Sequence, residues 1–372
     1  MTTTPSPVRK VEAGEKKESM MFAARMHEYG KPLVLESVPK PATLQGEEVL
    51  VKIGGAGLCH SDLHIMQGEW TSNLPLALPR ILGHEAAGWV GETGGSVPSN
   101  VLKSGDMVAI SGGWGCGVCE YCKQGDDHLC VSPIYPGVTA DGGYSQYILV
   151  PSYKYLLKVD KSSGLTPVDL APLTDAGLTP YRAVKRVRHL LGPGKAIAVI
   201  GIGGLGFYGI QYARLFSQGA KVVAVDRNQK KLENVLNKGF ADHAVELSSG
   251  RDMRDEIFKS TANNGLDVVI DCVGAENTIS DSFRVLRKKG ALVVVGLFGS
   301  EVRFPLMPSL LSEHQVHLSL WGNYSELSEV VELAKQGKIK HNIQRFPLAE
   351  INSAIEMLRS GQIQGRAVIV PS

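Results

Sequence analysis

Four cysteines crowded into one short segment carry the clearest chemistry in this chain. Cys116, Cys119, Cys122 and Cys130 lie in the run GCGVCEYCKQGDDHLC, separated by two, two and seven residues. Thiolates at this spacing can converge on one tetrahedral ion, and a closed structural zinc site favours such a ligand set. The pattern predicts a zinc-binding loop that stabilises structure and performs no chemistry itself.

A disulfide framework is the alternative for these cysteines. The chain has six cysteines in 372 residues, and its first residues lack the apolar core of a secretory signal, so we expect no oxidative pairing. The glycines at 115, 117 and 125 suit the tight turns of a metal-binding loop. We therefore favour zinc over disulfides here.

Three polar segments lie apart in the sequence, and each offers one candidate ligand for a second metal. Cys59 stands in GLCHSDLH, His84 in LGHE and Asp175 in LTDAGLTPY. A thiolate, an imidazole and a carboxylate would leave a fourth position for water or substrate, as a catalytic zinc requires. Spacing alone does not show that the three converge, and separately packed core residues are the alternative.

A glycine-rich turn in the middle of the chain predicts a dinucleotide site. Gly201, Gly203 and Gly206 form G-x-G-x-x-G after the apolar run 196–200, and a helical pattern, GFYGIQYARLF, follows. Such glycines let the backbone approach a pyrophosphate at a helix N-terminus. Asp226 ends the next strand, KVVAVD, where a carboxylate would accept hydrogen bonds from an unmodified ribose and repel a 2′-phosphate. We expect NAD rather than NADP, although Arg227 offers a neighbouring cation.

Strand and turn signals position these groups in two domains of an α/β protein. From Phe22 to about Pro172, short strands alternate with glycine and proline, which predicts a mainly β domain; its strand segments are 48–57, 86–94, 106–113 and 144–151. Further on, strands at 266–274 and 291–299 flank a helix at 280–289. This alternation predicts a Rossmann fold with a doubly wound parallel sheet. Residues 1–20 are polar and charged, which indicates a disordered tail.

Composition excludes several classes of protein. Lys and Arg total 39 against 37 Asp and Glu, so no basic surplus points to nucleic acid or an anionic membrane. No apolar run approaches the ~18 residues of a membrane span. At 372 residues the chain exceeds the size of a typical single core. We expect a cytoplasmic protein of two domains acting on a small molecule.

The chain resembles the zinc-dependent medium-chain alcohol dehydrogenases over residues 21–372, and most of all their tetrameric, NAD-dependent bacterial and archaeal members, some of which prefer secondary alcohols. The motifs occur in the family's order: GLCHSD, GHE, the four-cysteine lobe and GIGGLG with Asp226. The run APLTDAGLTPYRAV carries Asp175 where liver-type enzymes carry a cysteine ligand. The resemblance implies a GroES-like catalytic domain at 21–172 and 323–372, with the zinc lobe at 112–132, around a Rossmann domain at 173–322.

The resemblance also implies roles for residues around the predicted catalytic zinc. Asp62 matches a carboxylate that orients the zinc-bound histidine, and Glu85 matches a carboxylate behind the metal. Ser61 and His64 match a proton relay from the alcohol through the cofactor ribose to solvent. A turn-capping Asp62 and an ordinary surface His64 are the alternatives.

Cofactor and substrate contacts are implied in the same way. Trp114 would wall the substrate pocket, with a core position as its alternative. A solvated surface arginine is the alternative for Arg366. The residues expected to contact the cofactor are His60, Thr179, Gly201, Gly203, Gly204, Leu205, Gly206, Asp226, Arg227, Cys272, Val273, Val295, Leu297 and Arg366.

The implied activity is reversible hydride transfer between a primary or secondary alcohol and NAD, with two zinc ions per chain. Zinc acts as a Lewis acid toward the alcohol oxygen. An NADP-dependent carbonyl reductase, a zinc-free quinone or enoyl reductase, and a non-catalytic protein on the same fold are the alternatives. The resemblance implies a homotetramer, and we expect the run 291–299 to form the edge strand that pairs two subunits.

Overall fold

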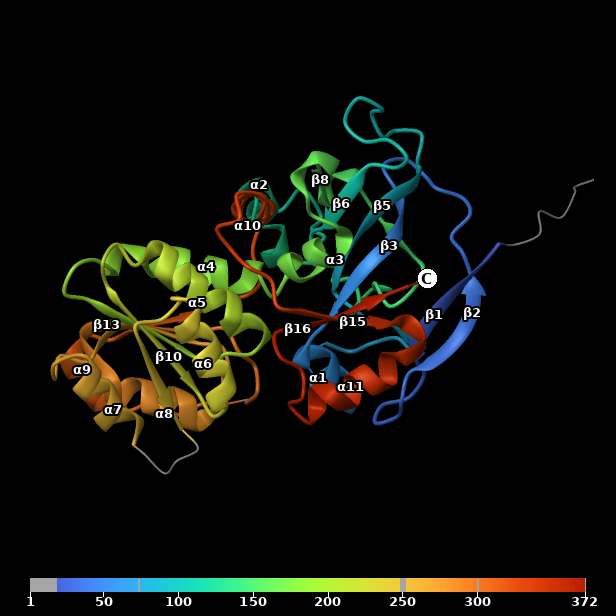
Figure 1. Cartoon of the computed structure of the whole chain (residues 1–372). Helices are drawn as coiled ribbons and strands as arrows, with labels where there is room; N and C mark the ends of the chain where they lie inside the picture. Colours follow the sequence, from blue (N-terminus) through green and yellow to red (C-terminus); the bar gives the residue numbers. More distant parts are fainter. Residues whose placement is uncertain (1–18, 73, 248–251, 300, 372) are drawn as a thin grey trace, which may run out of the picture.

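The protein has two parts, one built on a parallel sheet and the other on mainly antiparallel sheets (Figure 1). The computed structural model describes residues 19–72, 74–247, 252–299 and 301–371. Most of the predicted N-terminal tail lies outside these residues, and Met20 already begins strand β1. Among the described residues, no helix is long and apolar enough to cross a membrane.

The first sheet has six parallel strands in the order β11-β10-β9-β12-β13-β14. This order is that of a doubly wound sheet, whose halves diverge from its first strand. The strands are β9 (Ala196–Ile200), β10 (Lys221–Asp226), β11 (His243–Glu246), β12 (Leu266–Asp271), β13 (Leu286–Val294) and β14 (Gln315–Leu318). The helices around them are α4 (Leu178–Val187), α5 (Gly204–Phe216), α6 (Gln229–Asn237), α7 (Met253–Ser260), α8 (Glu276–Val285) and α9 (Leu306–Ser312).

Two predictions about this sheet are wrong. Helix α8 ends at Val285, and residues 286–289, which we expected in the helix, begin β13 instead. Leu286 pairs with Leu266 of β12, so long-range strand pairing overrides the local helical pattern. The run 291–299 is also not an edge, because β14 pairs along the free side of β13 and becomes the edge strand.

The second part of the protein is mainly antiparallel and includes both ends of the described chain. A seven-stranded sheet runs β15-β16-β3-β5-β6-β8, with β7 paired to β3, and a three-stranded sheet runs β2-β1-β4. The strands are β1 (Met20–Met26), β2 (Val34–Pro39), β3 (Val49–Leu58), β4 (Arg80–Ile81), β5 (Glu85–Thr93), β6 (Met107–Ile110), β7 (Tyr147–Val150), β8 (Leu156–Val159), β15 (Ile343–Pro347) and β16 (Arg366–Val370). The helices are α1 (His60–Gln67), α2 (Glu120–Lys123), α3 (Pro167–Leu170), α10 (Tyr324–Lys335) and α11 (Ile351–Arg359).

Three strand ends of this sheet meet at one point, and this meeting point positions the site. Gly57 near the end of β3 faces Glu85 at the start of β5, and Leu58 faces Ala367 of β16. The short 3-10 helix Ala171–Thr174 also contacts β3, β5 and β16. Cys59, Glu85 and Arg366, which are far apart in the sequence, therefore lie close together.

Candidate metal and cofactor site

The four cysteines of the predicted lobe gather into one cluster. One ligand atom from each of Cys116, Cys119, Cys122 and Cys130 lies within 4.8 Å of the others, and no disulfide joins them. Backbone N–H groups of Cys116 and Ser132 point at the Cys130 sulfur at 3.2 and 3.3 Å. Such N–H···S contacts favour thiolates, which are the metal-binding form.

The glycines of this lobe behave as predicted from the sequence. Gly117 and Gly125 have φ of +73° and +85°, a region that side chains with a Cβ avoid. A Cβ at Gly115 would lie 2.5 Å from the Cys122 sulfur. These turns bring the cysteine sulfurs together without help from distant residues, so the lobe fits a structural zinc ion.

The three ligands predicted for a second zinc also converge. Cys59, His84, Glu85 and Asp175 offer ligand atoms that lie within 4.8 Å of one another. His84 Nε2 is 3.4 Å and Cys59 Sγ is 4.0 Å from the same oxygen, Oδ2 of Asp175. Three donors of different kinds therefore face one point beside the meeting strand ends.

Electrostatics at this point favours the charged, metal-binding forms of Cys59 and Asp175. Burial alone raises the pKa of the Cys59 thiol, but the positive charge of Arg366 and the hydrogen bond to His84 lower it to about 7. Despite burial, His84 and Arg366 also hold the pKa of Asp175 below its ordinary value. A thiolate and a carboxylate are therefore accessible near neutral pH, and this donor set fits a zinc ion.

Asp62 lies behind the donors, and it also caps the start of α1, which was the alternative role. Its Oδ2 accepts the Cys59 backbone N–H at 2.9 Å and the Tyr144 hydroxyl at 2.8 Å. Its Oδ1 lies 3.4 Å from Nδ1 of His84. The carboxylate therefore faces the ring nitrogen of His84 opposite the one that faces Asp175, which is the arrangement expected behind a metal-bound histidine.

Glu85 and Arg366 form a fully buried pair next to the three donors. Arg366 donates through Nε to Glu85 Oε2 at 2.9 Å and through Nη2 to Oε1, which also accepts the Ala176 backbone N–H at 3.1 Å. Arg366 is 3 % exposed, so the surface alternative is wrong. Its guanidinium also lies beside Gly204, where a Cβ would stand 2.6 Å from Nη1. Arg366 thus bridges the donor cluster and the glycine-rich turn.

The glycine-rich turn has the predicted strand–turn–helix form. β9 ends at Ile200, Gly201 has φ +84°, and α5 begins at Gly204. A Cβ at Gly206 would overlap the carbonyl oxygen of Gly201, so only glycine lets the helix pack this close to the strand. Asp226, at the end of β10, accepts the Ile202 backbone N–H at 2.6 Å. Its carboxylate therefore stands over the turn.

Four of the other predicted cofactor residues, Cys272, Val273, Val295 and Leu297, directly follow the carboxyl ends of β12 and β13. The Cys272 backbone N–H donates to the Ile200 carbonyl at 2.9 Å. The Val295 N–H donates to the Asp271 carbonyl at 2.9 Å and the Phe298 N–H to the Val273 carbonyl at 3.1 Å, so the segments 271–273 and 295–298 lie side by side. Leu297 is 55 % exposed, Leu205 is half-buried, and Arg227 and His60 are exposed. This edge is where doubly wound sheets bind ligands.

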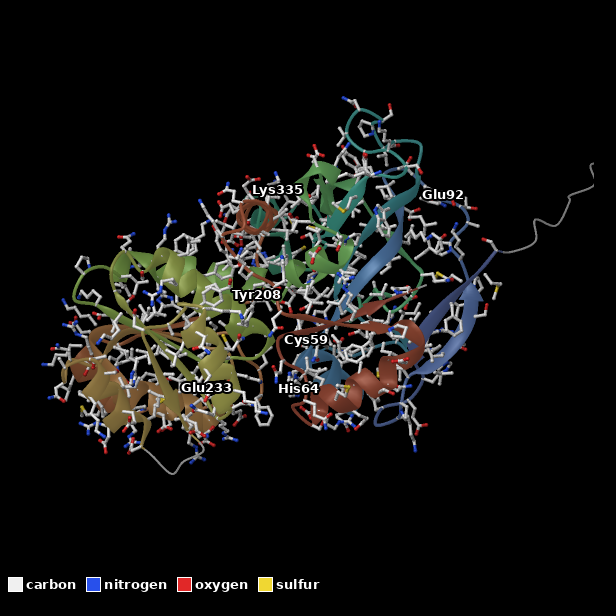
Figure 2. The ribbon with its side chains drawn as sticks, viewed as in Figure 1. Cys59, His64, Glu92, Tyr208, Glu233 and Lys335 are labelled. Carbon is white, nitrogen blue, oxygen red and sulfur yellow. The ribbon has the colours of Figure 1, made fainter. Side chains whose placement is uncertain are left out.

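Ser61 and His64 lie one turn apart on α1, directly after Cys59. The Ser61 hydroxyl is 3.5 Å from the Cys59 sulfur. His64 contacts Glu69, Trp70 and, across the junction of the two parts, Phe298. Figure 2 shows Cys59 and His64 near the junction between the two parts of the protein. His64 is thus not a freely solvated surface residue.

Two contacts to the predicted zinc ligands were not predicted from the sequence. The Thr179 hydroxyl donates to Asp175 Oδ1 at 2.6 Å, so Thr179 holds a donor as well as having a predicted cofactor role. Trp321 donates its indole N–H to the Thr174 carbonyl at 2.9 Å and meets the His84 ring edge-on at 5.8 Å. Trp114 is 3 % exposed and stacks on Tyr155 in the core of the β-rich part. Trp321, not Trp114, is the tryptophan in ring contact with His84.

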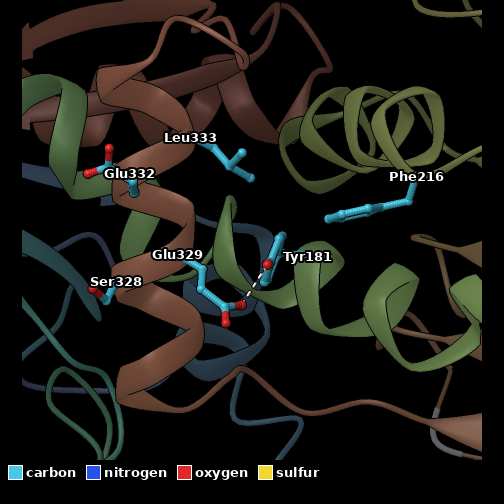
Figure 3. Close-up of a pocket in the computed structure, with 6 residues that line it drawn as sticks. All are labelled: Tyr181, Phe216, Ser328, Glu329, Glu332 and Leu333. Carbon is cyan, nitrogen blue, oxygen red and sulfur yellow. Dashed lines mark hydrogen bonds between the residues drawn. The ribbon is translucent and has the colours of Figure 1, made fainter.

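A pocket of about 420 Å³ lies elsewhere, between α4, α5 and α10 (Figure 3). It is lined by Tyr181, Phe216, Ser328, Glu329, Glu332 and Leu333. None of these belongs to the donor cluster or to the glycine-rich turn. Glu329 accepts the Tyr181 hydroxyl and pairs with Lys185, so its carboxylate already has partners.

Comparisons with known proteins agree with this geometry. Residues 45–161 match the family model of the alcohol dehydrogenase GroES-like domain, and residues 204–336 match that of zinc-binding dehydrogenases. An NAD-dependent alcohol dehydrogenase of Sulfurisphaera tokodaii is 42 % identical over 94 % of this chain and 100 % of its own length. A D-arabinose 1-dehydrogenase (NADP⁺) of Saccharolobus solfataricus is 36 % identical over 94 % of this chain and 97 % of its own.

Comparison with a solved structure gives the same result for the fold. The crystal structure of the alcohol dehydrogenase from Aeropyrum pernix superposes with a TM-score of 0.88 at 38 % identity, covering 94 % of this chain and 100 % of that one. Both family models match in sequence order, and the relatives cover nearly the whole chain. The chain therefore belongs to the zinc-containing alcohol dehydrogenase family.

Proposed function

We propose that this protein is a zinc-dependent alcohol dehydrogenase that interconverts primary or secondary alcohols and the corresponding aldehydes or ketones with NAD. The observation that carries the proposal is the meeting of Cys59, His84 and Asp175 beside Arg366, which also touches the glycine-rich turn. A bound zinc would act as a Lewis acid toward the alcohol oxygen, and a bound NAD would accept the hydride.

The chain's own residues would bind the zinc, orient its ligands and move the proton. Cys59, His84 and Asp175 would hold the zinc, Asp62 and Thr179 orient two of these ligands, and Glu85 lies beside them, paired with Arg366. We assign removal of the alcohol's hydroxyl proton to Ser61, whose hydroxyl stands 3.5 Å from the Cys59 sulfur and so next to the zinc site. It would pass its own proton on as it takes that of the alcohol. His64 passes the proton toward solvent. The four-cysteine lobe holds a second, structural zinc.

NAD is the cofactor that the site supports best. Asp226 stands over the glycine-rich turn, where its negative charge would repel a 2′-phosphate. Arg227 is exposed, and the name of one relative specifies NADP, so an NADP-dependent carbonyl reductase is the second candidate. The quinone or enoyl reductase alternative is disfavoured because both zinc ligand sets are present.

The domain division and the assembly remain proposals of the same kind. We assign residues 21–172 and 323–372 to the catalytic domain and 173–322 to the cofactor domain of a cytoplasmic homotetramer. Apolar side chains on α9 and on the edge strand β14 support a two-fold contact, since Leu310 is 66 % and Leu318 is 73 % exposed. Val118 and Val131, each 71 % exposed on the zinc lobe, support a second contact.

The decisive experiment measures zinc per chain and NAD reduction with a panel of primary, secondary and aromatic alcohols. We expect two zinc ions and alcohol-dependent NADH formation. Cys59→Ser should lose one zinc and nearly all turnover while keeping its melting temperature. One zinc in the undamaged protein, or no turnover with any alcohol or carbonyl, would contradict the proposal.

A further inference from the structure

Glu69, two residues after the end of helix α1, contacts the histidine of the proposed relay. Its Oε2 lies 2.5 Å from Nδ1 of His64. The helix ends with Gly68 at φ +75°, which turns the chain back on itself. This turn directs the Glu69 backbone N–H to the His64 carbonyl at 3.1 Å. Both the backbone and the carboxylate of Glu69 are therefore directed at His64.

Aromatic residues restrict the His64 ring in this contact. Trp70 stacks on it at 5.4 Å with an interplanar angle of 20°, and Phe298 meets it edge-on at 6.2 Å. The His64 side chain is only 13 % exposed, whereas Glu69 is 52 % exposed. The ring is thus confined, and the carboxylate is the part of the pair that faces water.

The contact decides which ring nitrogen can serve the relay. A neutral imidazole carries its proton on one nitrogen and accepts at the other. A carboxylate accepts only, so Nδ1 must carry the proton while Glu69 is ionised. Nε2 is then the nitrogen free to accept a proton.

We propose that Glu69 is a positioning residue of the proton relay, which holds the His64 ring in place and in the Nδ1–H tautomer. The inference rests on the proposed alcohol dehydrogenase function. In alcohol oxidation the hydroxyl proton reaches Nε2 by way of Ser61, while the hydride leaves with its electron pair to NAD. The imidazolium, paired with Glu69, then releases the proton from Nε2 to water, which regenerates the Nδ1–H form.

The competing explanation is that Glu69 and His64 form an ordinary surface ion pair. A second carboxylate–histidine pair in the chain provides a control for it. Glu36 of β2 lies 2.7 Å from Nε2 of His27, the residue after β1, and it also pairs with Arg25; all three lie outside the predicted site. Exposed pairs of this kind contribute little to stability. Glu36→Gln removes the same charge from the same kind of pair, so it reports any effect that is not specific to the relay.

The first test measures which ring nitrogen of His64 is protonated, and it requires no enzyme turnover. In ¹⁵N-histidine-labelled protein, with the His64 signals assigned by their loss in His64→Gln, we expect the neutral ring to be protonated at Nδ1. Glu69→Ala should move the population toward the Nε2–H form, and Glu36→Gln should not. A wild-type ring protonated at Nε2, or no change in Glu69→Ala, would overturn the inference.

The second test uses turnover with alcohol and NAD. Glu69→Gln should lower kcat about tenfold, a part of the 10²–10⁴-fold that positioned proton-transfer groups contribute, with KM for NAD and the melting temperature unchanged. Added imidazole buffer should restore kcat, and Glu69→Asp should restore part of it. A loss that buffer does not rescue, or no loss, would overturn the inference. Absence of turnover in the wild type alone would instead overturn the proposed function, since the tautomer test does not depend on it.

Discussion

Two fully buried tyrosines differ in the partners of their hydroxyl groups. The Tyr144 hydroxyl donates to Asp62 at 2.8 Å, whereas that of Tyr212 has no hydrogen-bond partner among the described residues. Both rings are 0 % exposed. We expect Tyr144→Phe to weaken the zinc held by His84 about tenfold, because partners behind a ligand tune metal affinity. Competition with a chelator measures this change.

Tyr212→Phe is the matched control for this prediction. Removing a buried hydroxyl without a partner should leave both zinc affinity and the free energy of unfolding unchanged or slightly improved. Equal zinc affinities in the two variants would show that Tyr144 does not act through Asp62.

A second prediction at the residue scale concerns cofactor choice at Asp226. Its Oδ2 accepts the Ile202 N–H at 2.6 Å and its Oδ1 the Asn228 N–H at 2.8 Å. Asp226→Asn keeps an oxygen acceptor but removes the charge that repels a 2′-phosphate. We expect kcat/KM for NADP relative to NAD to rise about tenfold, corresponding to roughly 1.4 kcal/mol. A wild-type enzyme that already prefers NADP would refute the role of Asp226.

At the scale of elements, the cysteine lobe is tied to two helices that flank the site. Asp126 of the lobe pairs with Arg182 of α4, which also pairs with Glu326 of α10. Cys119→Ser should therefore reduce zinc from two ions to one and lower the melting temperature by several degrees. Zinc analysis and calorimetry on the same sample test both effects.

Cys272→Ser is the control, because it removes a thiol that is not a predicted zinc ligand. Cys272 belongs to neither ligand set and is half-buried beside α5. This variant should keep two zinc ions and its melting temperature. If Cys119→Ser also kept both ions, the lobe would not be a zinc site.

At the scale of the whole molecule, we expect exposed apolar side chains on α9 and β14 to mediate assembly. Leu306, Leu310 and Leu311 of α9 are 66–68 % exposed, and Leu318 of the edge strand is 73 % exposed. We expect light scattering at micromolar concentration to give four times the chain mass. Leu318→Lys should dissociate the tetramer by placing a charge on the unpaired strand edge.

Val101→Lys provides the control, because Val101 is 47 % exposed but lies outside α9 and β14. It should leave the mass unchanged. A wild-type mass of twice the chain would contradict the tetramer and leave a dimer, which closed two-fold symmetry also permits.

The features that the sequence alone determined are local ones. The cysteine lobe closes within fifteen residues through glycine turns, and the glycine-rich turn connects a strand and a helix that adjoin it in the chain. Strands β9 and β10 have the predicted bounds because their buried apolar runs end at glycine or at a charged residue. Backbone conformation and side-chain spacing over a few residues carry all of this information.

Only the tertiary structure decided which distant residues share a site. Arg366 reaches Glu85 across 281 residues because β16 pairs with β3. The ring of Trp321 meets that of His84, which is also far from it in the sequence. The start of β13 at Leu286 and the edge position of β14 were likewise set by pairing between strands. Strand pairing and core packing join residues without regard to their separation in sequence, so no local pattern contains these contacts.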